Sequence, residues 1–275
     1  MLDPVVPDGA LARRLAAHEA SVHAWGAREL RDLGDAVLLH DLTDPEPFWN
    51  RVAAPDWPAK AAAFDRRLDE IVTLFATLGR LPHVRTLALG NRPEDLATRL
   101  GDAGFRPVRA DRSMILEVPG PCLALARTLA VRRDLQLEHV GHGPELRAME
   151  VARLLVRAFD VETDRVPALG AETLAAGRRP GGAVLLLLEA GLPAAVARRL
   201  TADGGTYLSS IGTAPALQGR GHGSLVTALA VAEALAEGTR FVHLLVDAEN
   251  RAAIHLYERL GFVPIGEPVL DLLMP

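Results

Sequence analysis

Residues 206–224 read TYLSSIGTAPALQGRGHGS, and this stretch decides the fold. Its first part, Tyr207–Thr213, has the composition of a strand. The run Gln218–Ser224 then places glycine at positions 219, 221 and 223, before a helical pattern that continues to about Glu237. Glycine lets the backbone pass close to a ligand because no Cβ stands in the way. A helix that opens from such a turn presents unpaired N–H groups and the positive end of its dipole. The stretch therefore predicts a phosphate-binding loop.

Two other kinds of phosphate loop are excluded by the same residues. A Walker loop requires Gly-x-x-x-x-Gly-Lys-Ser/Thr, and the only lysine in the chain is Lys60. A dinucleotide fingerprint requires Gly-x-Gly-x-x-Gly. Here Ser224 stands in the third glycine position, and Gly223 comes one place too early. The loop belongs to neither class.

A second motif follows the loop after a short apolar run. Phe241–Val246 has the length and branching of a buried strand. Asn250, a favourable N-cap, then begins a helix that carries Tyr257 and ends at Gly261. The pattern Gln-x-x-Gly-x-Gly, followed by Asn-x-x-Ala-x-x-Leu-Tyr-x-x-x-Gly-Phe, resembles the GNAT superfamily of acyl-CoA N-acyltransferases. The resemblance is strong over about residues 133–266 and faint over 10–118.

The resemblance implies that acetyl-CoA is the cosubstrate and that no metal takes part. It assigns the diphosphate of CoA to the backbone of the loop and the pantetheine arm to the preceding strand. The side chains of Arg220 and His222 could equally face solvent, and Asn250 could serve only as a helix cap. The implied cosubstrate contacts are Ile211, Gly212, Thr213, Gln218, Gly219, Arg220, Gly221, His222, Gly223, Ser224 and Asn250.

Tyr257 has the clearest chemical role. Acetyl transfer to an amine expels the CoA thiolate, which a nearby acid can stabilise. A tyrosine of pKa ~10 stays protonated at neutral pH and can donate to a thiol whose pKa is ~8.5. The spacing of Tyr257 from Ala253 and Leu260 puts it on the inward face of its helix. We therefore expect Tyr257 to act as the general acid; the alternative is a core tyrosine.

The residues leave the general base open. Related enzymes often place a carboxylate on the strand before the loop, but Tyr207–Thr213 has none. His243, Glu189, Asp160 and Glu162 are candidates, and their spacing favours none of them.

Composition predicts a packed globular protein without unusual partners. The chain has 275 residues, 49% hydrophobic and 24% charged, so we expect a core of two ordinary domains. The net charge is −5, with no basic face or tail, which argues against nucleic acid and acidic membranes. Cys122 is the single cysteine, which excludes an intrachain disulfide. Met1–Ala20 lacks the apolar core of a signal peptide, and no apolar run approaches the ~20 residues that span a bilayer. A cytoplasmic location is expected.

An offset of 157 residues aligns the two halves of the chain without a gap. Phe241–Val246 then falls on Val84–Leu89, and Gly261–Ile265 falls on Gly104–Val108. We expect two GNAT-like lobes of α/β (α+β) type, at residues 1–125 and 126–275, each a mixed, largely antiparallel sheet flanked by helices. The alternative is chance similarity. The first copy is degenerate because other residues replace the three glycines, Asn250 and Tyr257: they are Ala62, Phe64, Arg66, Pro93 and Leu100.

Periodicity and turn residues predict the elements. The expected helices span 10–31, 59–78, 94–101, a segment starting at Pro144, 171–176, 224–237 and 250–261. The expected strands span 36–42, 48–52, 84–89, 113–118, 135–140, 183–189, 194–200, 207–213, 241–246 and 269–273.

These observations favour an acetyltransferase that moves an acetyl group from acetyl-CoA to a primary amine of a small molecule or peptide. We expect it to be a monomer or homodimer. The missing strand carboxylate leaves a second interpretation, a non-catalytic acyl-CoA sensor or interaction module on the same scaffold.

Overall fold

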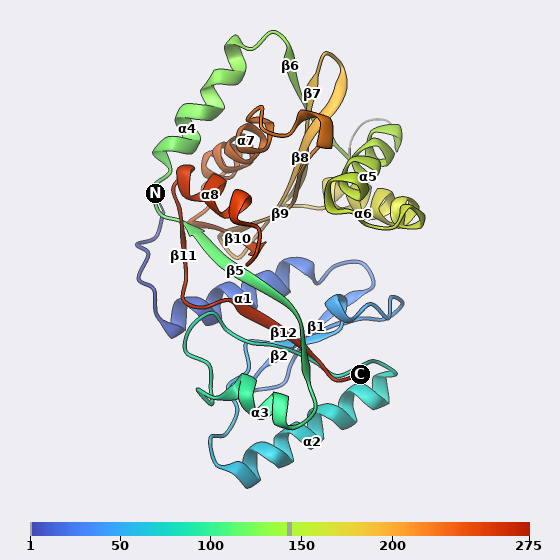
Figure 1. Cartoon of the computed structure of the whole chain (residues 1–275), viewed down its shortest axis with the longest axis vertical. Coiled ribbons are helices and arrows are strands. Elements are labelled where there is room, and N and C mark those ends of the chain that lie inside the picture. The colour runs from blue at the N-terminus through green and yellow to red at the C-terminus, as the bar shows by residue number, and fades with distance from the viewer. Residues whose placement is uncertain (1, 142–144) are drawn as a thin grey trace. The chain divides into compact units, whose positions relative to one another are not determined.

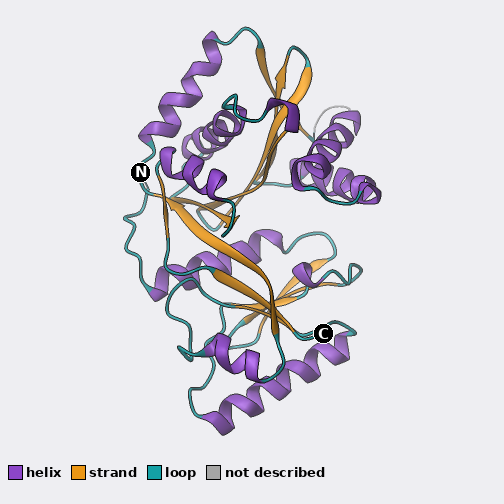
Figure 2. Ribbon diagram, viewed as in Figure 1, coloured by secondary structure: helices purple, strands orange, loops and turns teal. Residues whose placement is uncertain are grey.

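The computed structural model describes residues 2–141 and 145–275, so the helix start expected at Pro144 lies outside the described residues. The chain forms two compact units. The N-terminal unit comprises residues 5–114, 245–251 and 264–275, and the C-terminal unit comprises residues 2–4, 115–244 and 252–263. Each unit combines helices with strands (Figure 2).

The N-terminal unit holds sheet strands in the order β1-β2-β3-β4-β12-β5. Neighbouring strands are antiparallel, except that β3 and β4 are parallel. Its strands are β1 (Arg28–Asp32), β2 (Val37–Asp41), β3 (Arg51–Ala53), β4 (His83–Arg85), β5 (Arg106–Leu116) and β12 (Val269–Leu273). Its helices are α1 (Gly9–His23), the 3-10 turn η1 (Pro47–Trp49), α2 (Ala61–Leu78) and α3 (Leu96–Asp102).

Helices α2 and α3 pack on one face of this sheet, and α1 packs on the other (Figure 1). The apolar residues of α2 recur at helical spacing and meet Leu38, Val52, Val84 and Leu272 of the sheet. Burial of one such large side chain stabilises the fold by about 1.5–3 kcal/mol. The four buried residues of α2 are Phe64, Leu68, Ile71 and Phe75.

A buried ionic cluster joins the opposite face of the sheet to α1. The guanidinium of Arg51 donates to the Glu19 carboxylate at 2.7 Å, and that of Arg85 donates to Asp271 at 2.7 and 2.8 Å. A further contact of 3.3 Å joins the Arg85 guanidinium to the Glu19 carboxylate. Because a lone buried charge is costly, each member depends on the others. The cluster ties α1, β3, β4 and β12 together.

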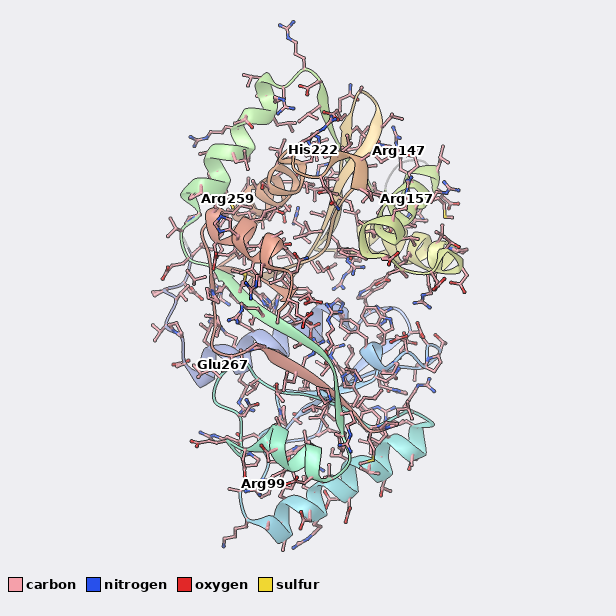
Figure 3. All side chains as sticks on the ribbon, in the orientation of Figure 1. Arg99, Arg147, Arg157, His222, Arg259 and Glu267 are labelled. Atoms are coloured by element: carbon pink, nitrogen blue, oxygen red, sulfur yellow. The ribbon has the colours of Figure 1, made fainter. Side chains whose placement is uncertain are left out.

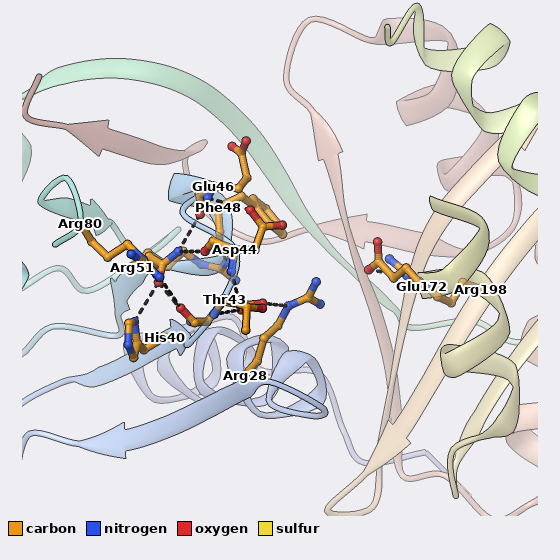
Figure 4. A network of polar contacts seen from close by, with 12 residues as sticks. Arg28, His40, Thr43, Asp44, Glu46, Phe48, Arg51, Arg80, Glu172 and Arg198 are labelled. Carbon is orange, nitrogen blue, oxygen red and sulfur yellow. Dashed lines mark hydrogen bonds and ion pairs between the residues drawn. The ribbon is translucent and has the colours of Figure 1, made fainter. Parts of the chain in front are cut away.

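The side chain of Asn50 holds the turn after β2, which contains Thr43, Asp44 and Glu46 (Figure 4). Its amide oxygen accepts the backbone N–H of Asp41 at 3.0 Å and lies 2.8 Å from Nδ1 of His40. Its amide nitrogen donates to the carbonyl of Asp44 at 2.8 Å. These bonds satisfy backbone N–H and carbonyl groups of the turn that are not paired with a neighbouring strand.

Four expected elements of this unit differ from the structure. The helix expected over 10–31 ends at His23, and residues 28–32 are strand β1, because the backbone leaves the helical region at Ala24, whose ψ is 81°. The strand expected over 84–89 shrinks to β4, because the Asn91 side chain binds both the N–H and the carbonyl of Leu87. The segment 48–52 is divided between η1 and β3, and β5 begins earlier than expected.

The C-terminal unit holds a sheet in the order β10-β9-β8-β7-β6. Its neighbours are antiparallel, except that β9 and β10 are parallel. Its strands are β6 (Leu135–Val140), β7 (Gly182–Glu189), β8 (Leu192–Ala202), β9 (Gly205–Thr213), β10 (Phe241–Asp247) and β11 (Phe262–Pro264). Its helices are α4 (Gly120–Arg127), η2 (Thr128–Val131), α5 (Glu145–Phe159), η3 (Thr163–Arg165), α6 (Val166–Arg178), η4 (Pro215–Leu217), α7 (His222–Ala236) and α8 (Arg251–Arg259).

Helices α5 and α6 cover one face of this sheet, and α7 covers the other (Figure 1). Adjacent residues of β8 contact helices on opposite faces of the sheet, because side chains alternate between the two faces along a strand. Arg198 pairs with Glu172 of α6, whereas Arg199 pairs with Glu233 and Glu237 of α7. Helices α6 and α7 both begin earlier than the sequence predicts.

The expectation of an α/β fold with mostly antiparallel sheets flanked by helices is confirmed. The division of the chain is more complex than a single boundary at residue 125. The chain passes between the units at Met114–Ile115 and returns twice near its end. The strand 269–273, expected in the second copy, is part of the N-terminal unit, where it lies between β4 and β5.

Candidate active site

The loop between β9 and α7 has the backbone that its glycines predict. Gly219 and Gly221 adopt φ values of +78° and +84°, in the left-handed region that residues with a Cβ rarely enter. A Cβ at either position would meet no described atom within 4 Å, so the loop is open on that side. Gly223 differs, because its Cβ would lie 3.0 Å from Oγ1 of Thr213. The first two glycines are needed for conformation, and the third for close packing against β9.

Helix α7 begins at His222, two residues before the expected start, with Gly221 as its N-cap. Glycine has no side chain to cap a helix, and no described side chain substitutes for it. The first intrahelical bond runs from the N–H of Leu225 to the carbonyl of Gly221 at 3.0 Å. The amides of His222, Gly223 and Ser224 therefore have no described acceptor, at the positive end of a 15-residue helix. This arrangement suits an anion.

A β-bulge interrupts the strand that leads into the loop. Arg198 of β8 is opposite Ser209, but Val196 is opposite Gly212, so two residues of β9 face one residue of β8. Ser210, in the bulge, has a φ of +50°. A bulge leaves backbone groups without their ladder partners and redirects the strand. Ile211, expected to offer backbone groups to a pantetheine arm, is the other residue of the bulge, and Gly212 and Thr213 follow it.

The side chains of Arg220 and His222 turn to the same carboxylate. Arg220, 58% exposed, places a guanidinium nitrogen 3.3 Å from Glu189 at the end of β7. The imidazole of His222 is buried at 2% exposure, and its Nε2 lies 3.5 Å from the other oxygen of Glu189. Figure 3 labels His222 at the start of α7. Gln218, just before the glycines, is exposed with an extended backbone.

Tyr257 is buried on the inward face of α8, as expected. Its ring stands edge-on to Phe262, with 5.9 Å between centroids. Burial raises the pKa of the Tyr257 phenol above its ordinary value, because the phenolate would lose its hydration. The group therefore keeps its proton throughout the physiological range. Asn250 lies directly before α8 and is exposed.

The candidate bases are scattered over the C-terminal unit. His243 is 1% exposed on β10, where its ring packs against Tyr207 and Phe241. Glu189 belongs to the loop contacts described above. Asp160 and Glu162 are exposed in the connection from α5 to α6. The structure brings none of the four together with Tyr257 in a described contact.

Two features of the site escaped the sequence. The bulge has no local signature, because Ser210 is an ordinary strand residue that adopts a positive φ. The contact of Glu189 with the loop joins positions 31 and 33 residues apart. A carboxylate at the end of a strand is too common to signal such a contact by itself.

Neither a metal cluster nor a membrane segment is found in the described chain. Residues 2–141 and 145–275 contain no group of three or more His, Cys, Asp or Glu side chains that could hold a metal ion. None of their helices has both the length and the apolar character that crossing a bilayer requires.

Comparisons with known proteins agree with this geometry. The family model described as FR47-like protein matches residues 185–268, which include the loop, α7 and α8. A mycothiol acetyltransferase of Gordonia bronchialis is 48% identical over 52 residues, 19% of this chain and 17% of the relative. The chain thus spans under a fifth of the length of that relative in the match.

Solved structures match over nearly the whole chain. A GCN5-related N-acetyltransferase from Kribbella flavida matches with a TM-score of 0.71 and 23% identity, covering 96% of each chain. A tandem GNAT protein from the clavulanic acid biosynthesis pathway matches with a TM-score of 0.57 and 15% identity, covering 98% of this chain and 96% of that one.

The chain shares its fold with these solved structures, and residues 185–268, which match the FR47-like family model, hold the loop and α8 of the site.

Proposed function

We propose that this protein transfers an acetyl group from acetyl-CoA to a primary amine of a small molecule or peptide. One observation carries the proposal: a loop with two left-handed glycines opens an uncapped helix directly after a bulged strand. The amides of His222, Gly223 and Ser224 would hold the diphosphate. The backbone of Ile211 and Thr213 would hold the pantetheine arm. Gly219 and Gly221 leave the open side that a bulky diphosphate requires.

Acetyl-CoA supplies an activated thioester. The amine nitrogen of the acceptor attacks the carbonyl carbon, the C–N bond forms, and the C–S bond breaks. Tyr257 is the proposed proton donor to the leaving sulfur. Its raised pKa makes complete proton transfer to a thiolate uphill, so its main contribution is a hydrogen bond that grows stronger as charge builds on the sulfur. The attacking amine loses its proton to a base or to water.

We also propose that the two lobes are copies of one fold and that only the second binds the cosubstrate. The 157-residue offset pairs His222, the first residue of α7, with residue 65 of the first copy. Helix α2 of the first copy begins at Ala61, about one turn earlier than that position. Its N-terminal residues have side chains instead of the glycines. Gly104 and Gly261, paired by the same offset, share left-handed φ values of +99° and +93° after α3 and α8. The tandem GNAT neighbour has a comparable overall fold.

The acetyltransferase proposal is tested by thiol release and by calorimetry. Purified protein is mixed with acetyl-CoA and a broad panel of primary amines, and free CoA thiol is followed with a thiol reagent. Acceptor-dependent thiol release supports the enzyme. CoA binding without thiol release in the presence of any amine would favour a non-catalytic acyl-CoA sensor. This is the second candidate function, because β9 carries no carboxylate or imidazole that could act as the base. An intact chain that binds no CoA contradicts both proposals.

Calorimetric stoichiometry tests the second proposal on the full chain. A fragment of residues 1–125 would lack β12, which is an inner strand of the N-terminal sheet, so the intact protein is the proper sample. We expect one CoA per chain, and a stoichiometry of two would refute the loss of the first site.

A further inference from the structure

The carboxylate of Glu189 contacts the phosphate loop on both sides of Gly221. Glu189 is the last residue of β7, where it is opposite Leu135 of β6 and Leu192 of β8. Its Oε2 lies 3.3 Å from Arg220, and its Oε1 lies 3.5 Å from Nε2 of His222. One acidic side chain thus faces the two basic side chains of a loop proposed to bind a diphosphate.

The two contacts differ in how easily they can be broken. His222 is buried, and its Nε2 is sealed from solvent without a well-directed hydrogen bond. The Glu189 carboxylate lies 3.5 Å from this nitrogen, and Asp134 interacts with the imidazole electrostatically. Arg220 is more than half exposed, and an exposed ion pair is weak because solvent screens it. The guanidinium of Arg220 can therefore leave Glu189 for another anion, whereas the imidazole of His222 stays in place.

We propose that Glu189 is an internal competitor for the cosubstrate: it occupies Arg220 in the free protein and gives up that guanidinium when the diphosphate of CoA binds. This inference rests on the proposed function, because it assumes that the loop binds CoA. Glu189 thereby sets the affinity of the site. It weakens CoA binding because the Arg220 guanidinium must leave an existing ion pair before it can contact the diphosphate, and it favours release of the CoA product.

Other charges near the loop do not replace this competitor. Arg132 and Asp134, at the start of β6, form their own pair, with two hydrogen bonds of 2.7 and 3.0 Å. Arg132 interacts electrostatically with Glu189, and Asp134 with His222, but no described contact joins either of them to Arg220. Glu189 is therefore the residue whose charge can be removed to expose the effect.

The test compares CoA affinity in four proteins by calorimetry: the wild type, Glu189→Gln, Arg220→Gln and the double variant. Glutamine keeps the size and the hydrogen-bonding oxygen of glutamate and removes the charge. We expect Glu189→Gln to bind CoA about two- to fivefold more tightly, the range that an exposed ion pair supports. In the Arg220→Gln background, the same change should have little effect, because the competed guanidinium is already gone.

Two results would overturn the inference. One is a Glu189→Gln variant that binds CoA with equal or weaker affinity than the wild type. The other is a gain that persists undiminished without Arg220, which would show simple repulsion at a distance. Glu138→Gln is the matched control, since it removes the charge of a carboxylate that pairs with Arg147 on α5, and CoA affinity should not change. Thermal unfolding of each variant confirms that the fold is retained.

The outcome is separable from that of the proposed function. If the wild type binds no CoA, the loop assignment fails and Glu189 has nothing to compete with. If the wild type binds CoA and the Glu189 variants bind it equally, the loop assignment stands and the competitor role is refuted.

Discussion

Asp271 and Arg85 form a buried bidentate ion pair across 186 residues of sequence, with hydrogen bonds of 2.7 and 2.8 Å. Neither side chain is more than 3% exposed. His83 adds a third contact, with Nε2 at 2.9 Å from the same carboxylate. Asp271 lies on β12, so this pair helps to hold the last strand of the chain between β4 and β5. The N-terminal unit is incomplete without the C-terminal segment.

Asp271→Asn should therefore destabilise the protein strongly. Removal of one partner leaves the Arg85 guanidinium buried with a poorer counter-ion, a loss of about 3–5 kcal/mol in the free energy of unfolding. Urea denaturation at pH 7 measures it. Asp95→Asn is the control, because Asp95 is exposed and pairs with Arg99 on the surface, where about 1 kcal/mol or less is expected. Equal losses in the two variants would contradict the role of the buried pair.

The same pair predicts acid sensitivity. Burial alone would raise the pKa of Asp271, but Arg85 and His83 hold it well below its usual range. A carboxyl with a lowered folded pKa contributes stability that is present above its unfolded pKa of ~3.9 and is lost as pH falls. The slope of stability against pH below 4 should be shallower in Asp271→Asn than in the wild type. Parallel slopes would show that other groups control acid unfolding.

Gly221→Val should abolish CoA binding while the protein still folds. Valine strongly disfavours the left-handed conformation at φ +84°, so the turn before α7 must change, and the added side chain would stand on the open side of the loop. Gly238→Val is a matched control at the other end of α7, with a φ of +85° and the same open surroundings. Both variants should lose similar stability, and only Gly221→Val should lose affinity by calorimetry. Unchanged affinity would refute our placement of the diphosphate.

Tyr257→Phe should lower kcat by about 10²–10⁴, the usual contribution of a general acid, with little change in acetyl-CoA affinity. Phenylalanine keeps the edge-on packing against Phe262 and removes only the donor. Because burial raises the pKa of Tyr257, the wild-type rate should show no decline from phenol ionisation between pH 7 and its ordinary pKa of ~10. Full activity in the variant would make Tyr257 a core residue only.

His139 should give the C-terminal unit a weak dependence on pH. Its hydrogen bond to Glu233, 2.8 Å long, raises the pKa of the imidazole above its ordinary value. Stability from a raised pKa is complete below the unfolded value of ~6.5 and is lost as pH rises through the folded value. The imidazole is about half exposed, so the effect should stay below about 1 kcal/mol. His139→Gln should flatten the stability profile between about pH 6 and 8, and an unchanged profile would contradict it.

Local sequence predicted the parts of the site that depend on backbone chemistry. Glycine is favoured where φ is positive, so the alternating glycines at 219 and 221 predicted the loop and the start of the helix that follows it. Helical spacing placed Tyr257 on the inward face of α8, where the structure has it. The same reasoning failed for residues 24–31, because the backbone leaves the helical conformation at Ala24 despite the apolar spacing around it.

The sequence by itself determined the glycine loop, the position of Tyr257 and the α/β alternation, since each follows from the conformational preferences of neighbouring residues. Only the tertiary structure decided that β12 belongs to the N-terminal unit, that β9 bulges at Ser210 and that Glu189 faces Arg220. These features depend on which distant strands become neighbours, and that choice is made by the packing and charge pairing of the whole chain. The Asp271–Arg85 pair shows the reason: each residue is unremarkable in its own segment, and the cost of burying either charge is offset only where the fold brings them together.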